Sequence, residues 1–396
     1  MDLKLKKVWA AAAVSLLSIT SAASADMGSQ SAKGATKGPM GVVNPNARPE
    51  IDDARGFATA EVLFWKVTED GLAYGIENQE VPVLATAGVS ATSSSGFYNA
   101  KVRNPDFDWD VGFRVGLGYN LTHDGWDLYA TWTYLRNNSS THDDADSGSD
   151  SERFYTLHSA SVGTPGGTIP TTPQRPFYRS ADVKWTVRLN IIDVELGREF
   201  YTSKFLTLRP FVGVRAAAFN QSYNIDYHGG TFVDVSSNAS LEEVNMKNNF
   251  FGVGLRAGLN SQWMFTQEWS FYGNAAISLV YGRFEIDQEE FNGEEDVAGS
   301  TRILEVDDVF RAARAITDLA FGIRYDHDFE ASNYHLALWL GWEQHIAFNQ
   351  NQLVHYNSIP GTAYVGPPTP ATYTTYVPES GDLTYEGFTL GISFDF

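Results

Sequence analysis

The chain has 396 residues, a formal net charge of −20, no cysteine and an aromatic content of 14%. The lack of cysteine excludes both a disulfide-built secreted scaffold and a lipid-anchored lipoprotein, and the acidic charge argues against nucleic acid as a partner. Beyond the amino terminus, no run approaches the roughly 20 apolar residues that a membrane helix needs.

The amino terminus has the pattern of a secretory signal peptide. Lys4, Lys6 and Lys7 precede a short apolar run, and Ala23-Ser24-Ala25 has the form of an A-x-A cleavage site. We therefore expect residues 1–25 to be a signal peptide that directs the chain to the periplasm. Residues 26–55 are rich in Gly, Ser, Ala and Pro without periodicity, which predicts a flexible periplasmic leader.

From residue 57 onward, apolar and polar residues alternate with period two in one segment after another. This alternation is typical of β-strands with one apolar and one polar face. The segments are 57–66, 109–119, 126–134, 183–200, 206–218, 251–260, 269–281, 317–325, 334–342 and 387–396. In the fourth segment the apolar parity changes at Ile191-Ile192, which indicates a β-bulge.

The last segment carries its own signal. It ends the chain on an aromatic residue, as the closing strand of bacterial outer-membrane barrels does. Its apolar face consists of Phe388, Leu390, Ile392, Phe394 and Phe396. We predict that these residues form the strand that closes a barrel.

The connections alternate between short and long. Short ones fall near 120–125, 201–204, 266–268 and 326–332, and long polar ones near 67–108, 135–181, 220–248, 284–312 and 344–384. Short periplasmic turns and long extracellular loops are typical of outer-membrane barrels, and Trp and Tyr at the strand ends fit the two membrane interfaces. A soluble β-sandwich gives no reason for aromatic strand ends.

Residues 56–396 are thus predicted to form an all-β, antiparallel, up-and-down transmembrane barrel of about ten strands. Two weak strand candidates, 70–77 and 97–103, leave twelve strands as the alternative.

Four arginines are expected to face the lumen, because arginine facing lipid at mid-depth costs roughly 2–4 kcal/mol. They are Arg114, Arg188, Arg215 and Arg256. Charged side chains at a constriction set ion selectivity, so these residues are candidate pore-lining groups that favour small anions. The alternative is a network of arginine–carboxylate pairs that fills a narrow barrel.

The sequence predicts no catalytic residue, no metal ligand and no cofactor. His335 and His345, with Glu343 between them, share one strand face, but roughly 33 Å of strand would separate the two histidines. The acidic stretches around Asp143-Asp144 and Glu289-Glu290 could bind divalent cations, although solvated loops are the favoured interpretation. A Ser-His-Asp site cannot be assembled from the strand positions.

Residues 61–76, EVLFWKVTEDGLAYGI, resemble the amino-terminal signature of the Legionella-type major outer membrane protein family. The segments Gly341–Gln344 (GWEQ) and Phe348–Leu353 (FNQNQL) are also similar to that family. The resemblance implies a pore-forming outer-membrane protein. The lack of cysteine departs from those relatives that form disulfide-linked envelope networks.

The favoured hypothesis is a passive, non-enzymatic channel for small hydrophilic solutes and ions in the bacterial outer membrane. The alternative is a surface-exposed adhesin or envelope-structural barrel with a plugged lumen, and a rim-site enzyme is the third hypothesis. The expected partners are outer-membrane lipid, lipopolysaccharide, permeating solutes and the barrel assembly machinery. Whether the chain forms a homo-oligomer stays open.

Overall fold

The computed structural model describes residues 46–47, 55–79, 100–122, 125–144, 152–158, 177–229, 241–293, 300–329, 334–361, 371–378 and 380–396. The chain divides into two compact units, Met1–Asn46 and Ala47–Phe396. The predicted signal peptide and almost all of the predicted leader lie outside the described residues, apart from β1 (Asn46–Ala47) and Arg55. Within the described part, no helix is long and apolar enough to cross a membrane.

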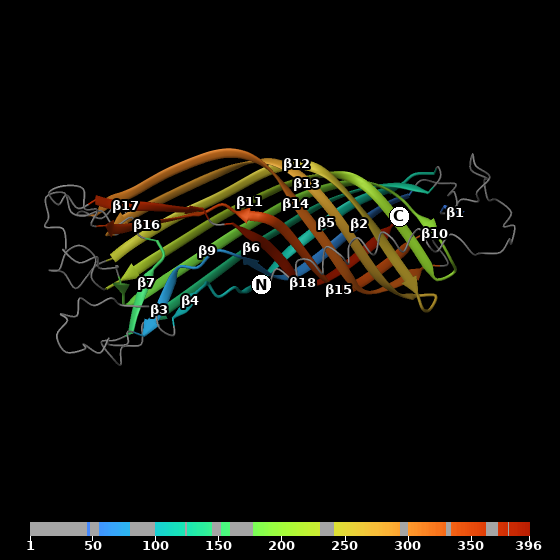
Figure 1. Cartoon of the computed structure of the whole chain (residues 1–396). Helices are drawn as coiled ribbons and strands as arrows, with labels where there is room; N and C mark the ends of the chain where they lie inside the picture. The colour runs from blue at the N-terminus through green and yellow to red at the C-terminus, as the bar shows by residue number, and fades with distance from the viewer. Residues whose placement is uncertain are drawn as a thin grey trace, which may run out of the picture. The chain divides into compact units, whose positions relative to one another are not determined.

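Ten long strands form one closed antiparallel cycle, which confirms the predicted ten-stranded barrel (Figure 1). They are β2 (Arg55–Glu69), β5 (Trp109–Asn120), β6 (Trp126–Asp144), β9 (Ser180–Arg198), β11 (Leu206–His228), β12 (Leu241–Met264), β13 (Trp269–Asn292), β14 (Thr301–Asp328), β15 (His335–Asn351) and β18 (Gly381–Asp395). Each strand pairs with the next in this order, and β18 pairs with β2 to close the cycle. The short β10 (Phe200–Tyr201) pairs with the start of β11.

Closure depends on the last strand, because a closed barrel satisfies every backbone polar group without water. Phe388 lies opposite Phe64, and the backbone N–H of Phe396 donates to the carbonyl of Gly56 at 2.9 Å. The side chains of Phe388, Leu390, Ile392, Phe394 and Phe396 point away from the lumen and are exposed at the barrel surface.

At one end of the barrel, here called the turn end, consecutive strands are joined by tight turns. In one of them the Thr266 side-chain oxygen accepts the backbone N–H of Trp269 at 2.8 Å. Another turn uses Gly125 at φ 70°, a left-handed conformation that glycine adopts without a Cβ clash.

The connections at the other end differ from the prediction, because much of what was expected to be loop is strand. β11 and β12 stay paired as far as His228 and Leu241, well into the expected loop 220–248. The strands continue because Phe219, Tyr223, Ile225 and Tyr227 still alternate with polar residues, but with the apolar side chains now inside. Because its outer face is polar, this segment was predicted from its polar residues to be a loop.

The predicted bulge at Ile191-Ile192 is absent. β9 keeps one register against β6 and β11 throughout, with Ile191 buried (3% exposed) and Ile192 on the outer surface (52%). The side chains of β9 keep pointing alternately inward and outward along the whole strand. What changes at Ile191 is which of the two faces carries the apolar residues. Above Ile191 the interior is apolar and the exterior polar, whereas below it the reverse holds.

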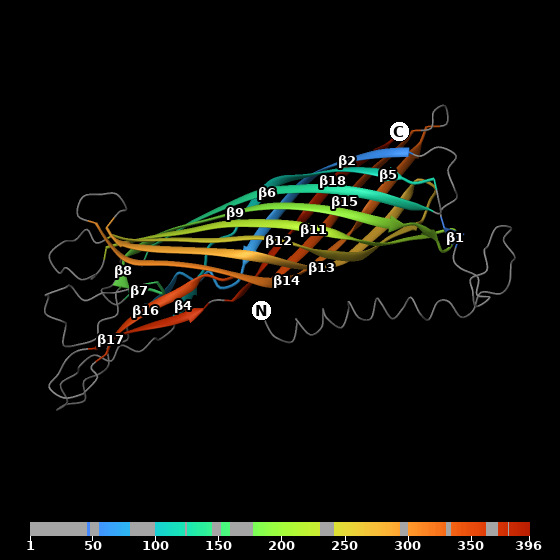
Figure 2. The same ribbon diagram turned by 90° about the horizontal axis from the view of Figure 1, so that it is seen from above.

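The half of the barrel away from the tight turns is called the cap half. There β6, β9 and β11–β14 run on as an extended sheet, while β15 leaves β14 after Ala347 (Figure 2). The inner face of this sheet meets the cap, which comprises a four-stranded sheet and a hairpin. The cap strands are β3 (Gly75–Gln79), β4 (Lys101–Arg103), β7 (Glu152–Thr156), β8 (Phe177–Tyr178), β16 (Val354–Gly361) and β17 (Ala371–Pro378).

The twelve-strand alternative is therefore wrong. Strands do form at Gly75–Gln79 and Lys101–Arg103, close to the two weak candidates, but they pair with each other, and Gly75–Gln79 also pairs with β7, in a separate sheet. They take no part in the barrel.

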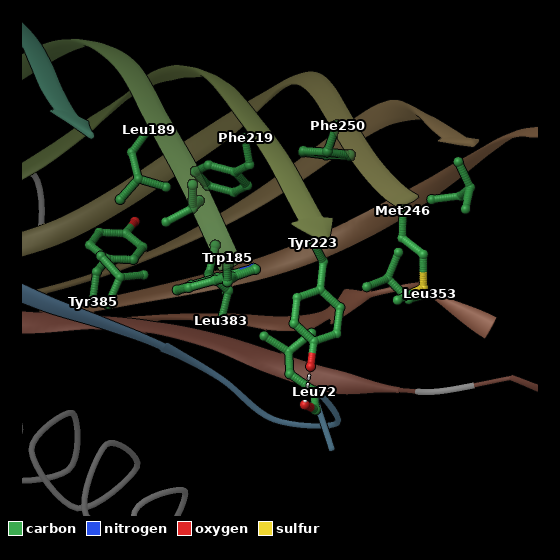
Figure 3. Packing of buried hydrophobic residues seen from close by; sticks show 14 of the residues in the cluster. Leu72, Trp185, Leu189, Phe219, Tyr223, Met246, Phe250, Leu353, Leu383 and Tyr385 are labelled. Carbon is green, nitrogen blue, oxygen red and sulfur yellow. Dashed lines mark hydrogen bonds between the residues drawn. The ribbon is translucent and has the colours of Figure 1, made fainter. Parts of the chain in front are cut away.

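An apolar core fills the space between the extended sheet and the cap (Figure 3). Tyr223 donates its hydroxyl to the carbonyl of Leu72 at 2.7 Å, and Tyr227 donates to the carbonyl of Tyr74 at 2.6 Å. These bonds satisfy buried hydroxyl groups and attach the chain that follows β2 to β11.

Candidate functional site

The outer surface of the barrel changes character along its height, and this locates the membrane. On β12 the outward side chains from Phe251 to Trp263 are mainly apolar, whereas Lys247 above them is exposed and charged. Aromatic residues lie at both limits of this belt. At the upper limit, on the cap side, Phe64, Trp109, Trp342 and Phe388 form one cluster of stacked and edge-on rings with centroids 5.0–6.5 Å apart. Such girdles are typical of membrane interfaces.

At the level of the apolar belt, the interior holds a continuous set of charged side chains, here called the ion-pair network. Its members come from eight of the ten barrel strands. They are Glu61, Arg114, Asp127, Asp193, Glu195, Arg209, Arg215, Arg256, Asp318, Glu343 and His345.

Asp318 of β14 is the centre of the network. Its carboxylate accepts hydrogen bonds from Arg215 at 3.0 Å and from Arg256, and it lies 2.7 Å from His345 Nδ1. Arg215 in turn forms a bidentate pair with Asp193, at 2.6 and 2.7 Å. All of these side chains are largely buried, so each charge depends on its partners for the solvation that it has lost.

Arg114 of β5 extends the network across the lumen. It donates to Glu61 on the neighbouring strand β2 at 2.6 Å and to Glu343 on β15 at 2.8 Å. His345 joins this part to Asp318, because its Nε2 lies 3.1 Å from Glu343. The strands β5 and β15 are separated in the wall by β2 and β18, so this link crosses the interior.

Arg209 forms the part of the network nearest the tight turns. It donates to both oxygens of Asp127 and to Glu195, which also accepts from Arg256 at 3.1 Å. Gly197 leaves room for this guanidinium, since a Cβ there would lie 2.5 Å from the Cζ of Arg209.

Directly above the network lies an aromatic layer, made of Trp65, Phe219, Phe250, Phe284 and Tyr385. Neighbouring rings are 4.6–6.5 Å apart from Trp65 through Tyr385, Phe219 and Phe250 to Phe284. Figure 3 shows Tyr385, Phe219 and Phe250 of this layer. The layer rests on the network, because Arg114 lies 5.4 Å from the Trp65 ring and His345 stacks on Tyr385 at 4.7 Å. These five side chains are fully buried.

The four predicted pore-lining arginines do not share one location. Arg114, Arg215 and Arg256 lie inside the barrel within the network. Arg188 is exposed on the outer surface of β9, and so the prediction that it faces the lumen is wrong. Asp182, on the same face, also lies outside, beside His142 and His228.

The error at Arg188 has a physical cause. Arg188 lies above the membrane belt, where the outer surface of the strand meets water and carries the polar residues. An arginine there has no lipid to avoid. The expectation that arginine points inward holds only within the belt.

Several network members were missed from sequence. Asp193 and Glu195 were not named as candidates, although they alternate with the outward-facing apolar residues Ile192, Val194 and Leu196. This alternation alone predicts that both carboxylates point into the lumen. Arg209 was not among the candidates named from sequence, and His345 was considered only as a metal ligand.

The segments that resemble the Legionella-type family meet where the chain leaves the barrel wall. Asn351 donates its side-chain amide to the carbonyl of Asp70 at 3.0 Å, and the backbone N–H of Asp70 bonds to Asp382 at 3.2 Å. Gly71 and Asn349 both have positive φ there, at 85° and 54°. Glycine and asparagine tolerate this conformation best, so both segments specify turns.

Comparison with protein families gives a match over residues 52–396 to the family described as Legionella pneumophila major outer membrane protein precursor. A comparison with curated proteins found no match.

Among solved structures, the fold is similar to that of the outer membrane protease OmpT from Escherichia coli, at a TM-score of 0.37 and 10% identity over 89% of this chain and 98% of that one. A Pseudomonas aeruginosa FadL homologue gives a TM-score of 0.26 and 12% identity over 87% and 90% of the two chains. The toluene transporter TodX from P. putida gives 0.26 and 9% over 88% and 92%. At these values neither the protease activity nor the transport activity carries over to this chain.

Proposed function

This chain belongs to the family of the Legionella pneumophila major outer membrane protein and is a bacterial outer-membrane β-barrel, and we propose that it acts as a narrow channel for small hydrophilic solutes and ions. The tight-turn end then faces the periplasm and the cap half faces the outside of the cell. We expect no catalytic activity.

The observation that carries the proposal is the charged interior at membrane level. A barrel that served only as an anchor could fill this space with apolar side chains, which would avoid the cost of burying eleven ionisable groups. Charged groups at a constriction act on permeating ions in a low dielectric and are screened little by salt. The ion-pair network is therefore the proposed constriction.

The network changes the selectivity expected from the arginines alone. It contains four guanidinium groups and six carboxylates, so its formal charge is negative when His345 is neutral. We therefore expect a preference for small cations, in place of the preference for anions expected from sequence.

The aromatic layer acts as the gate in this proposal. It lies above the network, is packed tightly and carries little charge, so water and ions pass only when its side chains move apart. Apolar constrictions of this kind gate channels by excluding water. The wild type should therefore show small or intermittent conductance.

Planar-bilayer recording tests the proposal. Trp65→Ala or Phe219→Ala should raise the conductance, because each removes a ring from the layer. Replacing Arg114 and Arg256 with Ser should strengthen the preference for cations. Arg188→Ser is the matched control: it removes the same charge from the outer surface and should leave the reversal potential unchanged.

The alternative is a closed barrel that serves as a surface-exposed adhesin or envelope-structural protein. The apolar core of the cap half favours this function, because it builds a folded extracellular part on top of the membrane barrel. Folded wild type and Phe219→Ala protein that both fail to conduct would support this alternative against the channel.

A further inference from the structure

The outer ends of β12 and β13 bring two glutamates into the interior of the cap half. Glu242 lies on the inward face of β12 and Glu290 on the inward face of β13, where Glu290 pairs with Val244, two residues from Glu242. Side chains at such diagonal positions reach each other across a strand pair. Both glutamates are fully buried (0% exposed).

Glu242 is unusual because neither of its carboxylate oxygens has a hydrogen-bond donor among the described residues. Removing a carboxylate from water without a hydrogen bond or a counter-charge is costly, and a second carboxyl group beside it adds repulsion. In the ion-pair network, buried arginines compensate the charge of the buried carboxylates, but none of these arginines contacts Glu242.

The neighbouring polar groups add acceptor oxygens and few donors. Gln288, also buried, donates its amide to Glu290 at 3.1 Å, and this leaves its own carbonyl oxygen Oε1 without a donor in the described structure. Tyr227 pairs with Glu242 across the strands, but its hydroxyl is committed to the carbonyl of Tyr74. Among the described residues, the surroundings of Glu242 are thus rich in oxygen atoms that can accept and poor in groups that can donate.

We propose that Glu242, Glu290 and the side-chain carbonyl of Gln288 bind a divalent cation of the calcium type between β12 and β13. Calcium takes six to eight oxygen ligands, and a carboxylate with two free oxygens can coordinate it in a bidentate manner. The two carboxylates match its charge. Backbone carbonyls and water would complete the coordination.

Calcium fits better than the other common ions. Glu242, Glu290 and the carbonyl of Gln288 offer only oxygen ligands, whereas zinc prefers nitrogen and sulfur. Magnesium requires near-ideal octahedral geometry and gives up its water reluctantly. Two flexible glutamates and an amide suit the larger ion.

The bound ion would join β12 and β13 just beyond the end of their mutual pairing. That pairing stops at Glu243 and Phe291, and beyond it only an isolated bridge from Glu242 to Gly293 connects the two strands in the described structure, although each still pairs with its other neighbour. A cation shared by both strands would therefore hold together the end of the extended sheet on the outside of the cell.

The test uses the full folded barrel in detergent after removal of metals with EGTA. Calcium should bind with a dissociation constant of about 0.1–1 mM, as in extracellular calcium modules, and should raise the unfolding temperature. Terbium, a luminescent substitute for calcium, should be sensitised by Tyr227, which pairs with Glu242.

Glu242→Gln should weaken calcium binding at least about tenfold and abolish the thermal shift, because it removes one of two ligand charges. Glu243→Gln is the matched control, since it removes the same charge from the next residue, which points outward. Gel mobility with and without heating shows that each variant is folded, and Glu290→Gln provides a second test if Glu242→Gln does not fold.

Two results would overturn the proposal. One is a wild-type barrel whose unfolding temperature does not change with calcium, which would mean that Glu242 is protonated. The other is terbium or calcium binding that survives in folded Glu242→Gln and Glu290→Gln.

Discussion

At the scale of single residues, Asp318 has more charged partners than any other carboxylate of the ion-pair network. Two arginines and a histidine from three different strands converge on it, so its charge balances groups that have lost their water. When a buried ion pair loses one partner, the other charge stays buried and uncompensated. This lowers the stability of the fold more than replacing both partners with apolar side chains does.

We therefore expect Asp318→Asn to lower the free energy of unfolding by about 3–5 kcal/mol, although the side chain keeps its size. Urea unfolding of the barrel in lipid vesicles, followed by tryptophan fluorescence, measures this. Asp307→Asn on the same strand is the control: Asp307 is exposed, and the change should stay within about 0.5 kcal/mol. Equal effects of the two substitutions would contradict the central role of Asp318.

Gly197 tests how tightly the network is packed. Because a Cβ at this position would meet the guanidinium of Arg209, Gly197→Ala should displace Arg209 from Asp127 and cost about 1–3 kcal/mol of stability, as overpacking does. At Gly273, another barrel glycine, the nearest atom to an added Cβ is Ser261 Oγ at 3.4 Å, so Gly273→Ala should be close to neutral. The same unfolding assay compares the two variants.

At the scale of elements, the sequence predicts where the strands lie better than it predicts which face of each strand points into the barrel. Period two is visible in all ten barrel strands, because alternation depends only on one face being apolar. It does not reveal which face that is. In β9 the apolar residues up to Ile191 point inward and those from Ile192 point to lipid, and the two halves together look like a bulge.

The candidate site shows the same limit. Arg114, Arg215 and Arg256 lie within the membrane belt, where lipid forces charge inward, and they could be placed from sequence. Arg188 lies above the belt, where nothing forces it inward. The pairing of Arg114 with Glu343 joins residues 229 positions apart across the lumen, and no pattern in the sequence specifies such a contact.

The attachment of the cap to the barrel should depend on pH. His158, just after β7, and His355 of β16 are buried with ring centroids 4.2 Å apart, and His158 also faces Tyr223 of β11 and the backbone of Ala73. Burial lowers the pKa of His355 to about 4, and burial and the neighbouring His355 hold the pKa of His158 well below its usual range.

Both pKa values lie below the roughly 6.5 of an unfolded histidine, so protons bind more readily when the cap detaches. The contribution of this pair to stability should be complete above about pH 6.5 and should be lost as the pH falls toward 4. Hydrogen exchange, corrected for intrinsic rates, should show weaker protection of residues 72–74 at pH 5 than at pH 7. The difference should shrink in His355→Asn, and protection that is independent of pH in the wild type would refute the idea.

At the scale of the whole molecule, one cycle of strands passes through two environments. Near the tight turns the barrel has an apolar exterior and a charged interior, as lipid outside and a polar lumen require. In the cap half it has a polar exterior and an apolar interior, as in a soluble protein. The change from one environment to the other occurs at the height marked by the aromatic layer inside the barrel and by the cluster of Phe64, Trp109, Trp342 and Phe388 outside it.

This arrangement predicts which residues can be reached from outside the cell. The chain has no cysteine, so single cysteines can be introduced without background labelling. Arg188→Cys and Lys247→Cys lie on the polar exterior of the cap half and should react with a membrane-impermeant maleimide in intact cells. Ser203→Cys, exposed in a tight turn, should react only after the outer membrane is permeabilised.

Because the three sites are all exposed, any difference in labelling reports the side of the membrane and not burial. Labelling of Ser203→Cys in intact cells would reverse the orientation, and protection of Arg188→Cys would mean that the apolar belt extends higher on β9 than its side chains indicate.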